Sequence, residues 1–247
     1  MSVDARFDLQ KAIVENQLVL YYQPVVVVAD RRLAAVEALV RWRHPERGIL
    51  PPSQFVPTIE RAGLARELTL WVLREAILQA AVWKRDREPL AVGVNLSPEN
   101  LRDPLFRRFL DITLRAVGAP ELLVAELPAA TLTSPEQLES LALMRKKGIR
   151  VAIDDVTAPV SLADVPADAI KLGRALVQRL PTDARALDEA TQIVREAKLA
   201  GRTVTAVGIE EDLTWRRIVA LGCDSAQGYF VAEPMSTTDL DEWRHRR

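Results

Sequence analysis

Polar side chains that can bind a metal ion or a phosphate recur in this 247-residue chain where short apolar segments end. The first is Glu37, which lies inside the apolar run 33–40 and is followed four residues later by Arg41. The others are Asn95, Glu126, Asp154, Asp155, Lys171, Glu210 and Gln227. Carboxylate and amide oxygens are hard donors that suit Mg²⁺ or Mn²⁺, and a phosphate is the natural partner of such an ion. The set therefore predicts a metal and phosphate site.

Each of these residues also has an ordinary explanation. An Asp after a strand is usually part of a turn or a helix cap. Side chains 37, 39 and 41 share one face of a strand, and such a polar face is costly to bury unless a ligand or an ion satisfies it. The alternative is a half-exposed edge strand with a Glu37–Arg41 pair facing solvent, and this segment alone leaves both interpretations open. Capping can explain a single residue, but it does not explain polar residues at so many successive strand ends.

The segments that must position these residues alternate between strand and helix patterns. Strands are predicted at 18–28, 33–43, 90–96, 122–127, 149–153, 169–172, 203–207 and 225–230. About eight strands in about 250 residues suit a closed (β/α)8 TIM-type barrel, in which the carboxyl ends of the strands converge on one face. No shift in composition marks a linker, so the sequence predicts one α/β domain over residues 1–247.

The first two strands are predicted to form an antiparallel hairpin, because the turn at Asp30-Arg31 is too short for a parallel crossover. Pro51–Phe55 is expected to start a short helix with Ser53 as its cap. The remaining predicted helices are a leading helix at 3–16 within segment 1–17, and helices at 64–84, 105–117, 135–147, 187–200 and 212–221.

Composition excludes several classes of function. A net charge of −1 provides no general attraction for DNA or for an acidic membrane surface. The apolar runs are too short to span a bilayer, and Met1–Gln10 is too polar for a signal peptide. A single cysteine, Cys223, excludes a disulfide within the chain and is typical of the cytoplasm. Two histidines, His44 and His245, do not suffice for a histidine metal site or a Ser-His-Asp triad.

A series of ordered motifs resembles the EAL family of cyclic di-GMP phosphodiesterases from about Leu9 to Leu240. The motifs are Leu20-Tyr21-Tyr22-Gln23-Pro24, Glu37-Ala38-Leu39 with Arg41-Trp42, Pro52 with Phe55, Val94-Asn95-Leu96-Ser97, Glu126, Ile153-Asp154-Asp155, Ile170-Lys171, Gly208-Ile209-Glu210, Gly222-Cys223-Asp224 and Gln227-Gly228-Tyr229. The resemblance implies a TIM-type barrel with one antiparallel strand. It also implies hydrolysis of cyclic di-GMP to pGpG with two Mg or Mn ions.

The resemblance also implies roles for individual residues. The implied ligands of a first ion are Glu37, Asn95, Glu126 and Asp154, and Asp155 is an implied ligand of a second. The implied catalytic residues are Glu37, Lys171 and Glu210, and Lys171 matches the lysine that orients the attacking water. Glu210 and Gln227 match residues that support the site, and Gln227 is also an implied ligand contact. Gln23, Leu39, Arg41 and Pro52 match positions that contact the dinucleotide, with Arg41 on a phosphate. Implied partners are cyclic di-GMP, a second copy of the chain, and a sensor or GGDEF domain in cis or trans.

Four departures from the family pattern fall on the side of the second ion. Val207 replaces a glutamate ligand, and Ala129 replaces a glutamate that steadies the loop after Asp155. The connection from Asp155 to Lys171 is shorter and lacks its glycines, and Gly173 replaces the aspartate of a Lys-Ile-Asp motif. Loss of a ligand or its support typically costs about 10–100-fold in affinity or activity. We therefore expect one ion and weak or absent hydrolysis.

Three hypotheses follow for the function. The first is a degenerate EAL domain that binds cyclic di-GMP and transmits or scaffolds a signal. The second is an active phosphodiesterase in which another acid, such as Glu210 or Glu211, replaces the lost ligand. The third is a protein-interaction module that binds no nucleotide, with Trp71, Trp83 and Trp215 as contact residues, although aromatic residues on helices more often belong to the core.

Overall fold

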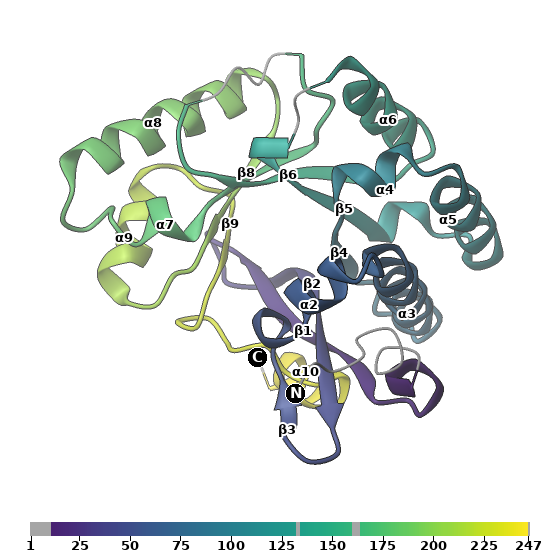
Figure 1. Ribbon diagram of the computed structural model, residues 1–247. Helices are drawn as coiled ribbons and strands as arrows, with labels where there is room; N and C mark the ends of the chain where they lie inside the picture. The colour runs from purple at the N-terminus through teal and green to yellow at the C-terminus, as the bar shows by residue number, and fades with distance from the viewer. Residues whose placement is uncertain (1–10, 132–133, 160–163, 247) are drawn as a thin grey trace.

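The computed structural model describes residues 11–131, 134–159 and 164–246 as a barrel surrounded by helices (Figure 1). The sheet has the strand order β1-β9-β8-β7-β6-β5-β4-β2-β3, and an additional pairing of β1 with β2 closes the ring. Its strands are β1 (Leu18–Val27), β2 (Leu33–His44), β3 (Gly48–Leu50), β4 (Ala91–Asn95), β5 (Leu123–Pro128), β6 (Arg150–Val156), β7 (Ala169–Leu172), β8 (Thr203–Val207) and β9 (Ser225–Gln227). The predicted TIM-type barrel is confirmed, and β3 is an extra strand beside it.

Strand β1 is the antiparallel strand of the ring. It pairs antiparallel with β2 from Leu18↔Trp42 to Val26↔Leu33, and antiparallel with β9 at its other edge. The ring strands β2 and β4 to β9 are mutually parallel. The turn between β1 and β2 contains Arg31 with a φ of 59°, which agrees with the tight hairpin predicted there.

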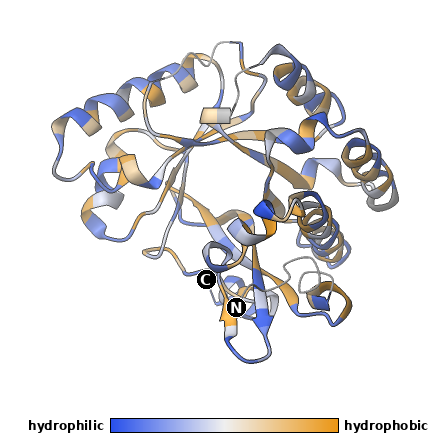
Figure 2. Cartoon of the chain, in the orientation of Figure 1, coloured by the Kyte–Doolittle hydropathy of each residue, from blue (hydrophilic) through white to orange (hydrophobic). Residues whose placement is uncertain are grey.

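Helices cover the outer face of the barrel (Figures 1 and 2). The longer ones are α3 (Ala65–Arg85), α5 (Pro104–Val117), α6 (Pro135–Lys146), α8 (Ala184–Leu199), α9 (Asp212–Ala220) and α10 (Thr237–His245). The shorter ones are η1 (Pro52–Gln54), α2 (Val56–Arg61), α4 (Pro98–Arg102), η2 (Pro120–Leu122), η3 (Ala129–Thr131) and α7 (Arg174–Val177). Figure 2 shows their apolar residues towards the barrel and their polar residues outward. This one-sided pattern explains why helix spacing was readable in the sequence.

Local signals determine where several helices begin and end. The Asp103 side chain accepts a hydrogen bond from Leu105 N at the start of α5, and Gly118 ends the helix with a φ of 64°. Ser53 does not cap a helix as predicted. It lies inside η1, whose N-cap position is Pro51, because proline at the first helical position starts the turn without a side-chain cap.

Some element boundaries differ from the predictions. Strand β6 continues to Val156, so the paired aspartates lie inside it rather than after it, and β9 ends at Gln227 rather than at 230. Helices α4, α7 and α10 were not predicted. Of the predicted leading helix, residues 11–14 are helical and the preceding part lies outside the described residues. Over the described ranges, no helix has the length and apolar character needed to cross a membrane.

The tryptophans of the interaction hypothesis pack inward. Trp83 is 1% exposed and its ring meets Tyr22 edge-on at 5.1 Å between centroids. Trp215 is buried beside Phe230, and Trp71 is partly buried against the core. These residues stabilise the helix layer and do not form an exposed contact surface.

Candidate active site

A lysine enclosed by carboxylates lies inside the barrel, near the carboxyl ends of its strands. Lys171 on β7 is 4% exposed, and its Nζ lies 3.1 Å from Glu37 Oε2 and 2.6 Å from Glu126 Oε2. Asp154 Oδ2 lies 3.5 Å away. The four residues come from β2, β5, β6 and β7, so one ammonium group connects four strands of the ring. We call these four residues the lysine cluster.

Two amide side chains orient Glu37 within the lysine cluster, and a third supports one of them. Asn95 Nδ2 donates to Glu37 Oε1 at 2.7 Å, and Gln227 Nε2 donates to Glu37 Oε2 at 2.7 Å. Gln227 also donates to Gln23 Oε1 at 3.0 Å, while Gln23 donates to the carbonyl of Ala232 at 3.2 Å. The structure therefore brings together seven residues predicted from separate strand segments. Their roles in binding and catalysis remain predictions.

The barrel register explains this convergence. Asn95 pairs with Glu126 across β4 and β5, and Glu37 pairs with Gly93 across β2 and β4. Gly93 provides space, because a Cβ at that position would lie 2.2 Å from Glu126 Oε1. The Glu126 carboxylate can thus turn towards Lys171 only because residue 93 has no side chain.

Burial and mutual repulsion shift the pKa values of the lysine cluster in different directions. Burial opposes ionisation of Glu37, but Lys171 and the amide hydrogen bonds hold its pKa below the usual value. Burial raises the pKa of Glu126 to about 8, against the attraction of Lys171 and together with repulsion from Glu37 and Asp154. Burial likewise raises the pKa of Asp154. Burial alone would lower the pKa of Lys171, but the surrounding carboxylates raise it and keep the ammonium charged.

The donor set of the cluster is chemically suited to one divalent cation. Three carboxylates surround a single ammonium group, so their full ionisation leaves two negative charges without a partner. Gln227 Oε1 is buried and lacks a hydrogen-bond partner among the described residues, which suits a cation or a water molecule. In this arrangement the described part of the chain holds no group of three or more acidic, histidine or cysteine side chains placed around a common metal position. The carboxylates are directed at Lys171 instead.

The neighbouring side of the rim is built differently. Asp155 has a φ of 51° at a register shift between β6 and β7, where Ile153 pairs with Ile170 but Val156 pairs with Leu172. This bulge brings the Asp155 carboxylate over Gly173, where a Cβ would lie 2.2 Å from Asp155 Oδ1. An aspartate at position 173, which the family pattern predicts, would therefore collide with Asp155 in this conformation.

Glu210 lies on this second side and outside the lysine cluster. Its Oε1 accepts hydrogen bonds from Arg174 Nη2 and, at 3.0 Å, from Gln178 Nε2. Arg174 in turn packs over Gly208, where an added Cβ would lie 2.3 Å from Arg174 Cγ. Val207 ends β8 without a metal-binding atom, and Ala129 lies in η3. The structure thus gives Glu210 basic and amide partners, and its predicted catalytic role stays a prediction.

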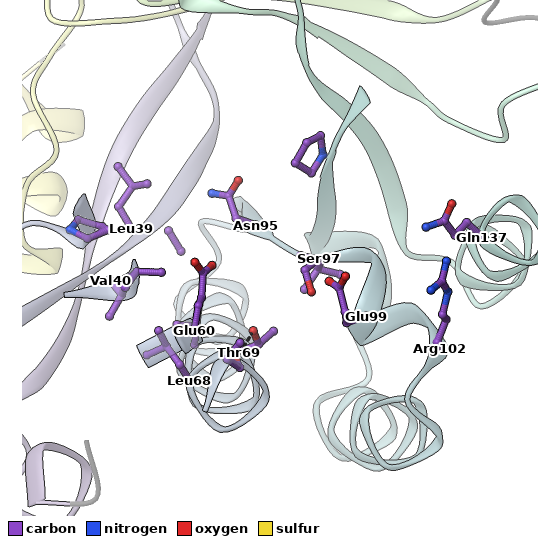
Figure 3. A pocket seen from close by; sticks show the side chains of 17 residues that line it. Leu39, Val40, Glu60, Leu68, Thr69, Asn95, Ser97, Glu99, Arg102 and Gln137 are labelled. Carbon is purple, nitrogen blue, oxygen red and sulfur yellow. Dashed lines mark hydrogen bonds between the residues drawn. The ribbon is translucent and has the colours of Figure 1, made fainter. Parts of the chain in front are cut away.

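The remaining predicted ligand contacts are Leu39 and Arg41 on β2 and Pro52 in η1. Arg41 Nη1 donates to the carbonyl of Val40 at 2.9 Å, and its guanidinium carbon lies 5.6 Å from the centre of the Tyr21 ring. Burial lowers the pKa of Arg41 from its very high usual value. Leu39 and Pro52 line a pocket of about 710 Å³ that also includes Asn95 (Figure 3).

Several polar residues of this pocket were not predicted as site residues. Figure 3 shows Glu60 from α2, and Ser97, Glu99 and Arg102 from the segment after β4. The available signal was a carboxylate five residues after Phe55 in a short amphipathic helix, and such a residue is usually a solvated one. Only the packing of α2 beside α3 shows that it faces a pocket.

Sequence comparison places these features in a known family. The model of the EAL domain matches residues 6–234. The chain is 34% identical over 247 residues to an uncharacterized signaling protein of Caulobacter vibrioides, covering 96% of this chain and 30% of that protein. It is 33% identical over 237 residues to a cyclic di-GMP phosphodiesterase of Pseudomonas aeruginosa, covering 92% of this chain and 40% of that protein. The chain thus spans less than half the length of these relatives.

Structure comparison agrees with the sequence match. A structure described as the PaMucR phosphodiesterase in complex with c-di-GMP superposes with a TM-score of 0.90 at 29% identity, covering 96% of this chain and 100% of that one. The barrel with its antiparallel strand, the ordered motifs and both comparisons lead to one assignment. The chain belongs to the EAL domain family.

Proposed function

We propose that this chain is an EAL-type signalling domain that binds cyclic di-GMP and hydrolyses it weakly or not at all. The observation that carries the proposal is the contrast across the rim. A full set of donors surrounds Lys171, whereas the side that a second ion needs holds Val207 and an Asp155 whose carboxylate lies against Gly173. Nucleotide binding requires the first side, and efficient hydrolysis requires both.

Binding of the dinucleotide rests on residues beside the lysine cluster. Glu37, Leu39 and Arg41 alternate along β2, so a phosphate held by Arg41 lies next to the acidic donors. A guanidinium group is planar and forked, which suits a phosphate. The relative of similar structure whose description names a c-di-GMP complex supports the choice of ligand.

One Mg²⁺ or Mn²⁺ ion completes the proposal. Glu37, Asn95, Glu126 and Asp154 would hold it, and a bound ion of this kind lowers the pKa of water and polarises a phosphate oxygen. The amides of Asn95 and Gln227 keep Glu37 oriented. Lys171, by the resemblance, positions the attacking water with its ammonium group.

Weak hydrolysis follows from the second side. Valine has no atom that binds a cation, and the β6 bulge directs Asp155 towards Gly173. Ala129 replaces a glutamate that, by the resemblance, steadies the loop after Asp155. Small displacements in such sites are costly, and each lost ligand or support typically reduces activity about 10–100-fold.

Calorimetry tests the binding half of the proposal. Titration of the chain with cyclic di-GMP in Mg²⁺ should give a saturable signal, and Arg41→Ala should weaken it strongly. Lys84→Ala, on the outer helix α3, is the matched control and should bind normally. No heat up to high micromolar ligand would remove the binding claim.

Chromatography tests the hydrolysis half. Incubation with cyclic di-GMP and Mn²⁺ should yield little pGpG. The second candidate function is an active phosphodiesterase, which is favoured by the complete first donor set and by Lys171. Brisk release of pGpG that is lost in Glu37→Ala would establish that candidate and overturn the proposed impairment.

The proposal also covers the partners and the location of the domain. The curated relatives are longer than this chain, so we propose that it acts with a sensor or GGDEF domain in cis or in trans, and as a homodimer. The near-neutral charge and the single buried Cys223 fit a cytoplasmic partner of a nucleotide rather than a partner of DNA or a membrane.

A further inference from the structure

A cavity inside the barrel extends from the lysine cluster to the amino-terminal face. It has a volume of about 230 Å³, and each strand of the ring contributes to its wall. Glu126 and Lys171 line one end. Arg150, Thr203 and Ser225 line the other end, and they are the first residues of β6, β8 and β9. We call this space the inner cavity.

Small side chains leave the inner cavity open. The interior of a TIM-type barrel is normally filled by layers of bulky branched residues. Here alanines line the wall two positions before three members of the lysine cluster, at Ala35 on β2, Ala152 on β6 and Ala169 on β7. Residues two positions apart share one face of a strand, so these alanines face the interior directly below the cluster. A layer that is usually bulky is therefore missing.

Solvent reaches the inner cavity from within the ring. Thr205 on β8 and Ser225 on β9 line the cavity and are partly exposed. Their neighbours Val204, Ala206 and Ala226 lie on the outer face of the same strands and are 0% exposed. The exposure of Thr205 and Ser225 therefore comes from the interior side, and Thr203 at the amino-terminal end is itself exposed.

Two hydroxyl groups give the wall of the inner cavity a polar character. Thr205 pairs with Lys171 in β7 and with Ser225 in β9, so the two hydroxyl residues are adjacent and one of them adjoins the lysine. Neither hydroxyl group has a hydrogen-bond partner among the residues that the structure describes. Polar groups beside a space that has room for several water molecules are satisfied by water, whereas purely apolar cavities stay dry.

We propose that the inner cavity is a water-filled passage through which water and protons reach the lysine cluster from the amino-terminal face. A buried carboxyl group such as Glu126 can exchange its proton with solvent only along such a path. The nucleotide of the proposed function lies at the opposite, carboxyl-terminal rim. The passage would therefore keep the cluster in contact with solvent while the rim is covered, but its existence does not depend on nucleotide binding.

A thiol placed beside Lys171 tests the passage. The background is Cys223→Ala, so that each protein carries a single thiol. Thr205→Cys places this thiol on the inner face of β8, and Ala206→Cys is the matched control on the outer face of the same strand. The rate of reaction with methyl methanethiosulfonate, a small neutral reagent, is measured by mass spectrometry. Thr205→Cys should react at least about tenfold faster than Ala206→Cys, because only an accessible thiol reacts without local unfolding.

Further substitutions identify the end at which the reagent enters. Thr203→Trp at the amino-terminal end and Ala169→Leu within the cavity narrow the passage, so each should slow the reaction of Thr205→Cys several-fold. Leu39→Trp, near the carboxyl end of β2, is the matched control and should leave the rate unchanged. Circular dichroism verifies that every variant is folded.

Two results would overturn the inference. Equal rates for Thr205→Cys and Ala206→Cys would show that the inner cavity is closed to solvent. A fast reaction that neither Thr203→Trp nor Ala169→Leu slows would show that solvent enters by another route. Neither measurement contains cyclic di-GMP, so both results leave the proposed function as it stands.

Discussion

The two sides of the barrel rim differ in how strongly the fold depends on them. On the first side, Lys171 connects carboxylates from three other strands, and each partner is buried or nearly buried. On the second side, Val207 and Asp155 lie at strand ends, and Glu210 is bound to Arg174 near the surface. The residues of the first side therefore belong to the core, whereas those of the second side lie at its margin.

This difference explains how one half of a site can persist while the other changes. Removing Lys171 would leave three carboxylates close together without a positive partner, which is strongly destabilising. Replacing an acid at position 207 or 173 leaves no such group of unpaired buried charges. The bulge in β6 and the absence of a side chain at Gly173 make room for the Asp155 carboxylate.

Replacement of Lys171 should have the largest effect on this comparison. Lys171→Ala leaves three carboxylates close together, and loss of one partner from a buried ion network costs about 3–5 kcal/mol. Urea unfolding measures this loss. Lys84→Ala removes an exposed pair with Glu121 and should cost under about 1 kcal/mol.

Mn²⁺ provides a second measurement on the same variant. A divalent cation that binds the folded cluster should recover part of the stability that Lys171→Ala loses. Equal losses for Lys171→Ala and Lys84→Ala would show that the first side does not stabilise the fold.

Substitutions on the second side should change the rate of hydrolysis rather than the stability of the fold. Val207→Glu restores a carboxylate at the end of β8 and should raise the rate of pGpG release about 10–100-fold, the usual range for a metal-site partner. Chromatography at saturating Mn²⁺ measures the rate. Val207→Gln has the same shape without the charge and should stay at the wild-type rate. Equal rates for both variants would indicate that the missing ligand does not limit hydrolysis.

The fold and much of the first side were predictable from the sequence, for a simple reason. Apolar strands followed by helices predict a parallel barrel, and the ends of its strands must converge on one face. That rule alone brings Asn95, Glu126 and Lys171 together, although they are far apart in the chain. The rule requires only the approximate ends of the strands, and the pattern of apolar residues reveals these well.

The second side depended on details that no pattern reveals. One extra residue in β6 and the left-handed backbone of Asp155 decide where its carboxylate points. The partner of Glu210 is Arg174, on a short helix that was not predicted. The pocket that contains Glu60 likewise arises from packing between α2, α3 and β4 rather than from local sequence. Bulges and loop contacts are set by tertiary structure, and helix and strand periodicity does not encode them.

Gly93 gives a sharper test of crowding on the first side. Gly93→Ala places a methyl group 2.2 Å from the present position of Glu126 Oε1, and such overpacking costs about 1–3 kcal/mol. In a Glu126→Ala background the collision disappears, so the same substitution should cost much less. Urea unfolding of the four proteins measures the coupling between the two sites. Strict additivity would contradict the close contact.

The smallest effect concerns pH and again separates the two sides. Burial holds the pKa of Glu126 near 8, with added repulsion from Glu37 and Asp154, so this carboxyl group is largely protonated in neutral solution. An ion that binds Glu126 must displace the proton. The apparent affinity for Mn²⁺ should therefore rise with pH, by at most about tenfold per unit below about pH 8, and become constant above it.

Calorimetry with Mn²⁺ across this pH range measures the dependence, and Glu126→Gln is the matched variant because its amide does not titrate. Its affinity should be weaker and its pH dependence flatter than those of the wild type. If Glu126→Gln retains the full pH dependence, the displaced proton belongs to another group, such as Asp154, whose pKa burial also raises. Since Glu126 is 5% exposed while Asp155 is exposed, a flat profile in the wild type would instead point to binding on the second side.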